Sequence, residues 1–434
     1  MLDENRRCDM ARSTTRRQFL ETSAAVAATT LALPAAARSA STSERLGVGF
    51  IGAGGRAGAH LRMVRQLRDQ DKYPVDLVAV CDVYRPRMES RKQSFGIPRG
   101  YLDHRELLAD PAVDVVCIAT PDHHHGYQAI DALAAGKHVY CEKPVTHWRQ
   151  FELTRKLAEA AAKSNCAFQL GTQAMSDPVW RQMKKLVADG LIGQPLSGEA
   201  GFFRAGDWGE RGMPIDDPAA RPGKDLDWEA FLGDAPQRTF SVDRLFRWRL
   251  FEDYAGGPAT DLYPHCLTQV VDVLGVGFPE TVVATGGIHR YHYELREVPD
   301  TFNLLASYPE NVTISLVGTQ ANDFQTTGRR GAGQRCPVIR GWEGSLTIDA
   351  DGGIVFTPVN GHPTQELRRF PVEHAEDNVL HWKNLLDCAR SGSEATWSPM
   401  ELAFRTQTVL QMAMLGWRQG KVAHFDPRAM AVVI

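Results

Sequence analysis

The feature that most constrains the fold is a glycine-rich turn at residues 52–57, which reads Gly-Ala-Gly-Gly-Arg-Ala and follows the apolar run 48–51. Glycine at the first position allows a tight turn, and glycine at the third lets the backbone approach a pyrophosphate. The small Ala57 allows the following helix to pack closely against the strand, with the pyrophosphate at the helix N-terminus. The turn therefore predicts a strand–turn–helix unit that binds a nicotinamide dinucleotide. Four of its residues are expected at the cofactor: Gly52, Gly54, Gly55 and Arg56.

The first half of the chain alternates short apolar runs with amphipathic stretches, which is typical of a parallel sheet wrapped by helices. Strands are expected at residues 46–51, 75–81, 113–119, 138–141 and 167–170, and helices at 57–67, 126–135 and 150–164. This pattern predicts a doubly wound α/β domain over residues 46–171, a Rossmann domain.

The second half, residues 172–434, has a different pattern. Its strand-like runs alternate polar and apolar residues, as in an antiparallel sheet with one open face. Strands are expected at 196–204, 281–288, 302–308, 313–317 and 346–348, and closing helices at 381–390 and 399–419. Between residues 205 and 258 the abundance of Trp, Asp, Gly and Pro predicts long ordered loops rather than regular elements. Such loops on a rigid sheet usually carry substrate contacts.

Composition excludes several classes of partner. With 43% hydrophobic and 23% charged residues, the chain has the composition of a soluble globular protein, and its length suggests two domains. A net charge of -3 gives no reason to expect nucleic acid or an anionic membrane as a partner. The cysteines are scattered without a CxxC pair. Cys81, Cys117 and Cys141 lie in or at the end of apolar runs, so they are predicted to be buried free thiols.

Residues 1–37 have the composition of an export signal. The motif Thr-Arg-Arg-Gln-Phe-Leu at 15–20 lies in a basic leader, and the Ala- and Thr-rich run 24–37 ends in three alanines. This run is too short and too weakly apolar for a membrane-spanning helix, which takes about 20 apolar residues. The segment predicts export by the twin-arginine machinery to the periplasm or another exported location. A disordered basic tail is the alternative.

Export by this route has a consequence for the cofactor. The twin-arginine route carries proteins that are already folded, so a cofactor can be loaded before the protein leaves the cytoplasm. Outside the inner membrane there is no pool of nicotinamide dinucleotide to exchange with. We therefore expect an enzyme that holds its cofactor tightly and restores its redox state within its own active site.

Asp82 follows the apolar strand 78–81 at the position where a dinucleotide-binding domain carries its ribose-binding acid. A carboxylate there accepts hydrogen bonds from a ribose 2′-hydroxyl and repels a 2′-phosphate, so NAD is favoured over NADP. Arg85 is close enough in sequence to keep NADP possible. The alternative is an aspartate that only forms the turn at the strand end.

Two further motifs lie at the ends of later strands. Thr120-Pro121 opens a run that includes His125, and Glu142-Lys143-Pro144 follows the strand 138–141. With these motifs the chain resembles the glucose–fructose oxidoreductase and inositol dehydrogenase family (Gfo/Idh/MocA) over essentially everything after the leader. The resemblance implies an N-terminal Rossmann domain and a C-terminal α+β domain whose large open, mainly antiparallel sheet supports homodimer or homotetramer contacts.

The resemblance also implies roles for individual residues. In this family the lysine of the Glu-Lys-Pro tripeptide lies between nicotinamide and substrate and orients a sugar hydroxyl, a position that Lys143 matches. The remaining matches are expected beside the nicotinamide: Thr120, Pro121, His125, Glu142 and Gln173. The adjacent His123, His124 and His125 do not predict a metal site, because neighbouring side chains diverge and no HxxxH pair accompanies them.

The segment 254–265 carries the second catalytic element. Asp261 and His265 are four residues apart, about one helical turn, so they are expected to point into one pocket. Pro264 fits only in the first turn of a helix that continues through Leu274. Histidine is suited to accept the hydroxyl proton as hydride leaves, and a carboxylate can orient it. Asp-x-x-x-His resembles the family's acid–base pair; a capping aspartate and a core histidine are the alternative.

These observations favour an oxidoreductase that transfers hydride between a secondary alcohol of a sugar or polyol and a tightly held NAD, with NADP possible. A second hypothesis uses the same residues to borrow and return hydride, giving glycosidase, lyase or epimerase chemistry. The intact Lys143 argues against the glycosidases of this family, which depart from the tripeptide at the lysine. A third hypothesis is a non-enzymatic sugar sensor. Further candidates for substrate contact are Trp180, Trp208, Trp228, Trp248, Arg204, Asp207, Arg247 and Arg249.

Overall fold

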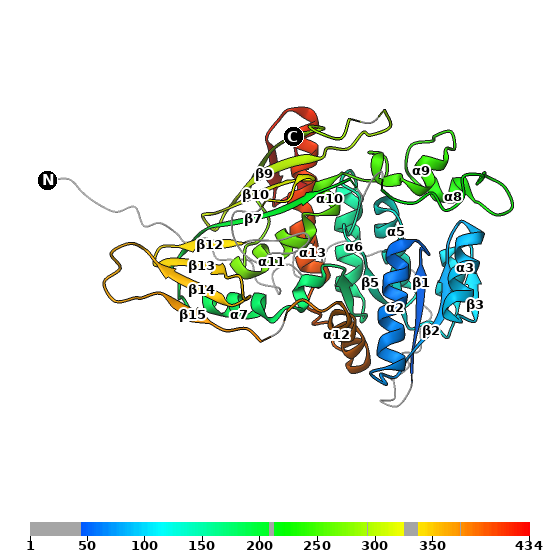
Figure 1. Cartoon of the computed structure of the whole chain (residues 1–434), viewed down its shortest axis with the longest axis horizontal. Coiled ribbons are helices and arrows are strands. Elements are labelled where there is room, and N and C mark those ends of the chain that lie inside the picture. The colour runs from blue at the N-terminus through cyan, green and yellow to red at the C-terminus, as the bar shows by residue number, and fades with distance from the viewer. Residues whose placement is uncertain (1–44, 208–211, 293, 325–336, 374) are drawn as a thin grey trace. The chain divides into compact units, whose positions relative to one another are not determined.

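The computed structural model describes residues 45–207, 212–292, 294–324, 337–373 and 375–434. The predicted export signal, Trp208 and Cys336 lie outside the described residues. Residues 42–434 belong to one compact unit, and its elements are shown in Figure 1.

The first sheet is built from six parallel strands of the described residues in the order β3-β2-β1-β4-β5-β6. The strands are β1 (Leu46–Ile51), β2 (Val75–Cys81), β3 (Arg99–Tyr101), β4 (Val115–Ile118), β5 (His138–Cys141) and β6 (Phe168–Leu170). The predicted Rossmann architecture is confirmed. The order reverses between β1 and β4, so the carboxyl ends of these two strands flank the crevice where such sheets bind their ligands.

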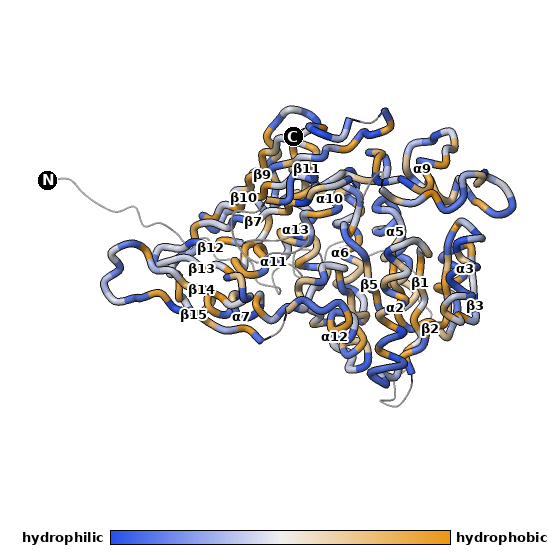
Figure 2. Tube along the Cα trace, viewed as in Figure 1, coloured by the Kyte–Doolittle hydropathy of each residue, from blue (hydrophilic) through white to orange (hydrophobic). Residues whose placement is uncertain are grey.

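Five helices connect these strands: α2 (Gly55–Asp69), α3 (Arg85–Phe95), α4 (His104–Ala109), α5 (Asp122–Ala134) and α6 (Phe151–Lys163). Every residue of β1 and β4 is buried, which explains why both strands are continuous apolar runs. Figure 2 shows hydrophobic residues recurring along the strands. Cys81, Cys117 and Cys141 are buried free thiols, as predicted.

The second sheet has eleven strands among the described residues, in the order β15-β14-β13-β12-β7-β10-β9-β8-β16-β17 with β11 paired to β7. Only the pair β7–β10 is parallel within this described sheet, so the predicted, mainly antiparallel sheet is confirmed. The strands are β7 (Pro195–Ala205), β8 (Thr281–Gly287), β9 (Thr301–Tyr308), β10 (Val312–Thr319), β11 (Ala321–Asn322), β12 (Val338–Gly341), β13 (Gly344–Ile348), β14 (Ile354–Pro358), β15 (Arg368–Phe370), β16 (Ala423–Asp426) and β17 (Ala431–Val433).

Helices of the second half pack in two places. The longer ones are α7 (Pro178–Ala188), α11 (Pro264–Leu274), α12 (Asn378–Ser391) and α13 (Met400–Gln419), and a 3₁₀ turn, η1 (Gln173–Ser176), precedes α7. α11 packs on β7 and α13 on β8. α12 instead packs against α2, with Trp382 buried in the same core cluster as Val48 and Phe50 of β1. The closing helix therefore completes the core of the nucleotide-binding half.

The segment 205–258 differs in part from the prediction of loops alone. It contains the short helices α8 (Trp228–Leu232) and α9 (Val242–Phe246) and a 3₁₀ turn, η2 (Trp248–Leu250). These elements bury their own apolar cluster, which includes Trp228, Phe231, Phe246 and Trp248. A third short α-helix, α10 (Pro258–Asp261), ends just after the segment. None of the helices in the described residues is long and apolar enough to span a bilayer.

The contact between α11 and β7 yields a prediction about stability. A Cβ added to Gly198 of β7 would lie 2.5 Å from Val270 Cγ1 and 3.0 Å from Leu274 Cδ1, both on α11. We expect Gly198→Ala to lower the free energy of unfolding by about 1–3 kcal/mol because the helix must shift. The control is Gly55→Ala, whose Cβ would meet nothing within 4 Å. Urea denaturation measures the free energy of unfolding of both variants, and a Gly198→Ala variant as stable as the parent would contradict the close packing.

Candidate functional site

The glycine turn joins β1 to α2 and is packed on one side only. Gly52 has φ 87°, and a Cβ there would lie 2.8 Å from the carbonyl carbon and oxygen of Ala119. A side chain is thus disfavoured at Gly52 both by conformation and by space. A Cβ on Gly55 would meet nothing within 4 Å. The turn is therefore closed toward β4 and open at the N-terminus of α2, which fits the pyrophosphate of a dinucleotide.

Asp82 lies at the end of β2 and is 9% exposed. Its Oδ2 accepts a hydrogen bond from Ala53 N at 2.8 Å, and its Oδ1 accepts one from Tyr84 N at 2.9 Å. The carboxylate thus ties the glycine turn to the chain after β2. Each carboxylate oxygen accepts a second bond, so the predicted contact with the ribose remains compatible with this geometry. Its role in the cofactor site stays a prediction.

Arg91 of α3 contacts the glycine turn and was not identified from the sequence. Its Nε donates to Ala53 O at 3.0 Å, and its guanidinium lies 3.2 Å from the position of a Cβ on Gly58. Met88 is the buried residue of α3, so this helix has no repeating apolar positions from which the sequence could have predicted it. The guanidinium adds positive charge beside the open turn, which favours a pyrophosphate.

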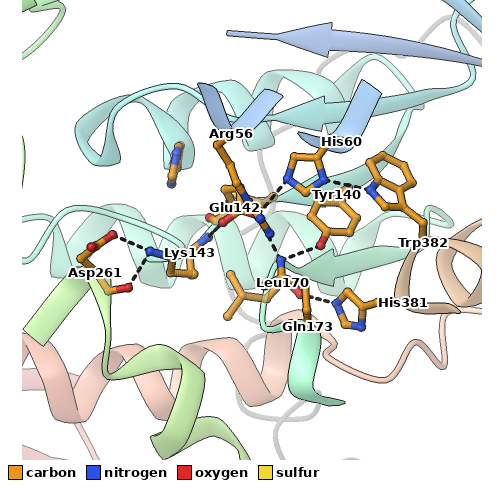
Figure 3. A network of polar contacts seen from close by, with 12 residues as sticks. Arg56, His60, Tyr140, Glu142, Lys143, Leu170, Gln173, Asp261, His381 and Trp382 are labelled. Carbon is orange, nitrogen blue, oxygen red and sulfur yellow. Dashed lines mark hydrogen bonds and ion pairs between the residues drawn. The ribbon is translucent and has the colours of Figure 1, made fainter. Parts of the chain in front are cut away.

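Glu142 is the centre of a buried polar network (Figure 3). Its Oε1 accepts from Arg56 Nε at 2.7 Å, lies 2.9 Å from His60 Nε2 and accepts from Gln173 Nε2 at 3.1 Å. Burial acts to raise the pKa of Glu142, but Arg56, His60 and Lys143 outweigh it and hold the pKa well below its usual range. Glu142, Arg56 and Gln173 are thus brought together, in contact with one another.

His60 was not identified from the sequence, although it connects this network to α12. Trp382 Nε1 donates to His60 Nδ1 at 2.9 Å, so the ring proton is on Nε2 and is donated to Glu142. Burial, followed by the charge of Arg56, lowers the pKa of His60 and keeps the ring neutral. A lone histidine on an apolar helix face carries no signal for such a role, because its partner is 82 residues away.

The Thr120-Pro121 motif is held against the Glu-Lys-Pro motif by His125. Its Nδ1 lies 2.6 Å from Pro144 O and its Nε2 lies 2.8 Å from Thr120 O. Pro121 is the N-cap of α5, and Thr120 Oγ1 donates to Gln128 Oε1 at 2.7 Å. His125 therefore joins the two loops that flank the carboxyl ends of β4 and β5. Contact of these residues with the nicotinamide stays a prediction.

The neighbouring histidines point elsewhere. His123 Nε2 and His124 Nε2 lie 2.9 Å and 2.7 Å from the carbonyl oxygen of Phe231, which belongs to α8. Burial lowers the pKa of His124 to about 4, so its ring is neutral at physiological pH. No group of three or more His, Cys, Asp or Glu side chains in the described residues is arranged to hold a metal ion.

Lys143 and Asp261 form the core of the candidate catalytic site (Figure 3). Lys143 Nζ donates to the Asp261 backbone oxygen at 2.6 Å and to its Oδ1 at 2.7 Å, and Arg249 Nε donates to the same Oδ1 at 3.2 Å. Burial acts to raise the pKa of Asp261, but Lys143 and Arg249 hold it well below its usual range. The carboxylate therefore stays ionised. An ammonium has three donors, so Lys143 has one left for a substrate hydroxyl.

Asp261 and His265 lie on two successive helices. Asp261 is the last residue of α10, and α11 begins at Pro264, as predicted for that proline. The helix is interrupted because Pro264 has no N–H to continue the hydrogen-bond ladder. His265 lies in the first turn of α11, half-buried, with its ring 6.5 Å from that of Phe202. The structure brings Asp261 to Lys143 and Arg249, and the base role of His265 stays a prediction.

Asp122 is a further acid at this site that was not identified from the sequence. It is the first residue of α5, is 4% exposed, and its Oδ2 accepts from Thr260 Oγ1 at 3.1 Å. Burial raises the pKa of Asp122 to about 7, although Arg249 and Lys143 act to lower it. A carboxyl group with this pKa exchanges protons near neutral pH.

The remaining candidates for substrate contact divide into two groups. Trp180, Trp228 and Trp248 are each less than 8% exposed and belong to core clusters, so their rings mainly pack the interior. Arg247 donates to Met213 O at 3.2 Å, and Asp207 pairs with the fully buried Arg296 at 2.7 Å. Arg249 differs from Arg247 and Asp207 because its guanidinium contacts the predicted catalytic residue Asp261, on whose pKa the charge of Arg204 also acts.

Fold and site together define an oxidoreductase with an NAD-binding Rossmann domain. The family described as "Oxidoreductase family, NAD-binding Rossmann fold" matches residues 46–172, and "Oxidoreductase family, C-terminal alpha/beta domain" matches residues 176–318. Together these matches cover more than half of the chain. The chain belongs to the Gfo/Idh/MocA oxidoreductase family, as the sequence motifs indicated.

Several curated proteins are similar to parts of the chain. Levoglucosan dehydrogenase from Pseudarthrobacter phenanthrenivorans is 30% identical over 189 residues, 43% of this chain and 45% of that protein. Myo-inositol 2-dehydrogenase from Thermotoga maritima is 28% identical over 148 residues, 34% of this chain and 42% of that protein. Trans-1,2-dihydrobenzene-1,2-diol dehydrogenase from Sus scrofa is 26% identical over 311 residues, 69% of this chain and 79% of that protein. The chain spans less than half the length of several curated relatives that it matches.

Solved structures share the fold over most of the chain. Levoglucosan dehydrogenase in complex with NADH has a TM-score of 0.65 at 17% identity, with 87% of this chain and 98% of that chain covered. GenD2 from gentamicin A biosynthesis, in complex with NAD, has a TM-score of 0.63 at 23% identity, with 91% and 99% covered. At these identities the likeness shows the fold.

The buried Asp122 predicts a pH dependence of stability. The pKa of Asp122 is about 7 in the folded protein and about 3.9 in the unfolded chain. Protonation of Asp122 therefore stabilises the fold fully below pH ~4, and this stabilisation is lost as the pH rises to about 7. Asp122→Asn has no such loss. We expect the variant to gain about 2–4 kcal/mol relative to the parent between pH 4 and pH 8. Urea denaturation across this range measures the difference, with Asp71→Asn at an exposed position as the control. Parallel curves for Asp122→Asn and the parent would contradict the shifted pKa.

Proposed function

We propose that this protein is an exported oxidoreductase that transfers hydride between a secondary alcohol of a sugar or polyol and an NAD that it retains. One observation carries the proposal: Lys143 Nζ is held 2.7 Å from Asp261 Oδ1, next to the crevice at the carboxyl ends of the first sheet. Levoglucosan and inositol dehydrogenases among the relatives support a sugar or polyol as the substrate class.

The residues of the site support this reaction in separate ways. NAD, when bound, supplies the hydride acceptor. Lys143 is cationic beside the ionised Asp261, and its third donor orients the alcohol and favours the developing alkoxide. His265, at the start of α11, accepts the hydroxyl proton as the hydride leaves the carbon. Asp261, which also accepts a hydrogen bond from Arg249, holds Lys143 in place rather than taking a proton.

Retention of the cofactor follows from export. Residues 1–37 support passage through the twin-arginine machinery, and a protein without access to a dinucleotide pool needs a second carbonyl substrate to take the hydride back. One sugar is then oxidised and a second carbonyl compound is reduced on the same cofactor, so electrons and protons balance over two half-reactions.

Asp122 favours a second candidate function. Its carboxyl group, with a pKa of about 7, lies close to Lys143 and Asp261 and can accept and return a proton near neutral pH. A transient ketone beside such a base lets a neighbouring carbon lose its proton, as in a hydride-borrowing lyase, epimerase or glycosidase. The hydride then returns to the same molecule, and no second substrate is needed.

The open face of the second sheet supports a homodimer or homotetramer. Val283 of β8, Leu305 of β9 and Val317 of β10 are each more than 40% exposed and lie on three adjacent strands. Exposed apolar residues in such a row are typical of a surface that is covered by another chain.

Cofactor retention is tested on protein without its leader that has been desalted and then denatured. We expect close to one NAD per chain in the released fraction, measured by mass together with NADH and the phosphorylated forms. The desalted protein should turn over a pair of substrates, a polyol and a second sugar carbonyl, without added NAD. Lys143→Met should keep the cofactor and lose about 100-fold or more in turnover, because the oriented cation is removed.

Other outcomes of this experiment discriminate among the candidates. Steady reduction of added soluble NAD by a single sugar contradicts retention. Product formation from one substrate without net NADH supports the hydride-borrowing reaction. A ligand response that survives in Lys143→Met, in protein without turnover, supports a sensor.

Export is tested in the twin-arginine motif itself. We expect Arg16→Lys/Arg17→Lys to leave the protein in the cytoplasm with residues 1–37 attached, as measured by cell fractionation and intact mass. The control, Arg6→Lys/Arg7→Lys, changes two arginines of the same leader outside the motif and should be exported normally. Equal export of both variants would contradict the twin-arginine route.

A further inference from the structure

A segment of the second half lies against the chain that follows Asp82. Tyr84 Oη donates to Asp217 Oδ2 at 2.8 Å, and Arg87 donates to Asp216 Oδ2 at 2.9 Å from Nε and 2.7 Å from its terminal nitrogen. The backbone adds two bonds, from Arg85 N to Asp225 O at 2.8 Å and from Asp227 N to Val83 O at 3.1 Å. Residues 212–227 are called the strap below.

The strap is also held by apolar contacts. Tyr84 is 4% exposed and belongs to a cluster with Ala220, Leu226, Trp228 and Phe246. The cluster consists of residues from 213–255 together with Tyr84 and the adjacent Val83, so the two residues after Asp82 are inserted into the core of another segment. The strap is thus a packed wall with a fixed position.

The first residues of the strap lie at the catalytic end of the site. Arg247 Nε donates to Met213 O at 3.2 Å, and Arg249 lies 3.4 Å from Met213 Sδ while its Nε donates to Asp261. Between Met213 and Asp217 the chain therefore passes from the neighbours of Lys143 to the neighbours of Asp82. Four residues span at most about 13 Å.

Asp82 and Lys143 mark the two ends of the predicted cofactor position, and the strap contacts the surroundings of both. We propose that residues 212–227 form the outer wall of the dinucleotide site and lie across the bound cofactor. The cofactor then leaves only when the contacts of Asp216 and Asp217 with Arg87 and Tyr84 open. This inference rests on the proposed NAD site and explains how the cofactor is retained.

The test compares two tyrosines with the same local chemistry. Tyr84 donates to Asp217 at 2.8 Å, and Tyr73 donates to Asp387 Oδ1, also at 2.8 Å. Tyr73 precedes β2 and Asp82 follows it, so the two residues lie at opposite ends of this strand. Tyr84→Phe and Tyr73→Phe therefore each delete one hydroxyl bonded to an aspartate, and only Tyr84→Phe loosens the strap.

The measurement is the rate of NADH release. Protein without its leader is loaded with NADH and mixed with excess NAD, and the loss of bound-NADH fluorescence is followed. We expect release about 3- to 10-fold faster in Tyr84→Phe and at least about tenfold faster in Asp216→Asn/Asp217→Asn, since hydrogen bonds to charged groups are lost. Tyr73→Phe should release NADH at the parent rate.

Proteolysis gives a second readout that is independent of release and activity. Lys224 is an exposed strap residue followed by Asp225, so trypsin can cut after it, whereas Pro222 protects the bond after Arg221. We expect added NAD to slow cleavage after Lys224 in the parent and to slow it less in Asp216→Asn/Asp217→Asn.

Equal release rates in the parent and all three variants, or cleavage unaffected by NAD, would overturn the strap while the proposed function stands. Protein that takes up no NADH would overturn both. Faster release in the strap variants supports the strap even if the desalted parent carries no cofactor, an outcome that contradicts retention alone.

Discussion

The site depends on one buried carboxylate, that of Glu142 at the end of β5. It binds Arg56 and His60 from α2, and Gln173 from η1. Through His60 it is also connected to Trp382 of α12. Removing one partner of a buried ion pair costs about 3–5 kcal/mol, because the remaining charge is left without compensation. The Glu142 carboxylate thus fixes α2, the helix that follows the glycine turn, relative to Lys143, the next residue after Glu142.

The predicted catalytic end of the site is a second charge cluster, in which different partners separate the pKa values of two buried acids. Asp261 is ionised because it forms ion pairs with both Lys143 and Arg249. Asp122 has a hydroxyl partner in Thr260, and burial brings its pKa to about 7. Two carboxyl groups whose environments push their pKa values apart are suited to different tasks. Asp261 holds the cation, and Asp122 is available for proton exchange.

Much of the fold could be predicted because the signals are local. β1, β2 and β5 begin and end at the predicted residues, since each is a mainly apolar run bounded by polar residues, glycine or proline. α3 and β3 were not predicted. α3 buries only Met88 among its residues, and β3 has three half-buried residues, so neither has a readable period. The helices α8 and α9 within 205–258 were not predicted for a similar reason: five residues are too few to show a helical period of apolar positions.

The sequence by itself determined the parallel sheet, the glycine turn and the presence of Lys143, Asp261 and His265, because each depends on neighbouring residues or a recognisable motif. Only the tertiary structure decided that Asp261 pairs with Lys143, 118 residues away, and that Thr260 meets Asp122 across 138 residues. It also decided that Asp216 and Asp217 meet Arg87 and Tyr84. Such contacts are set by the packing of whole elements, and side chains that meet only after folding carry no common pattern along the chain.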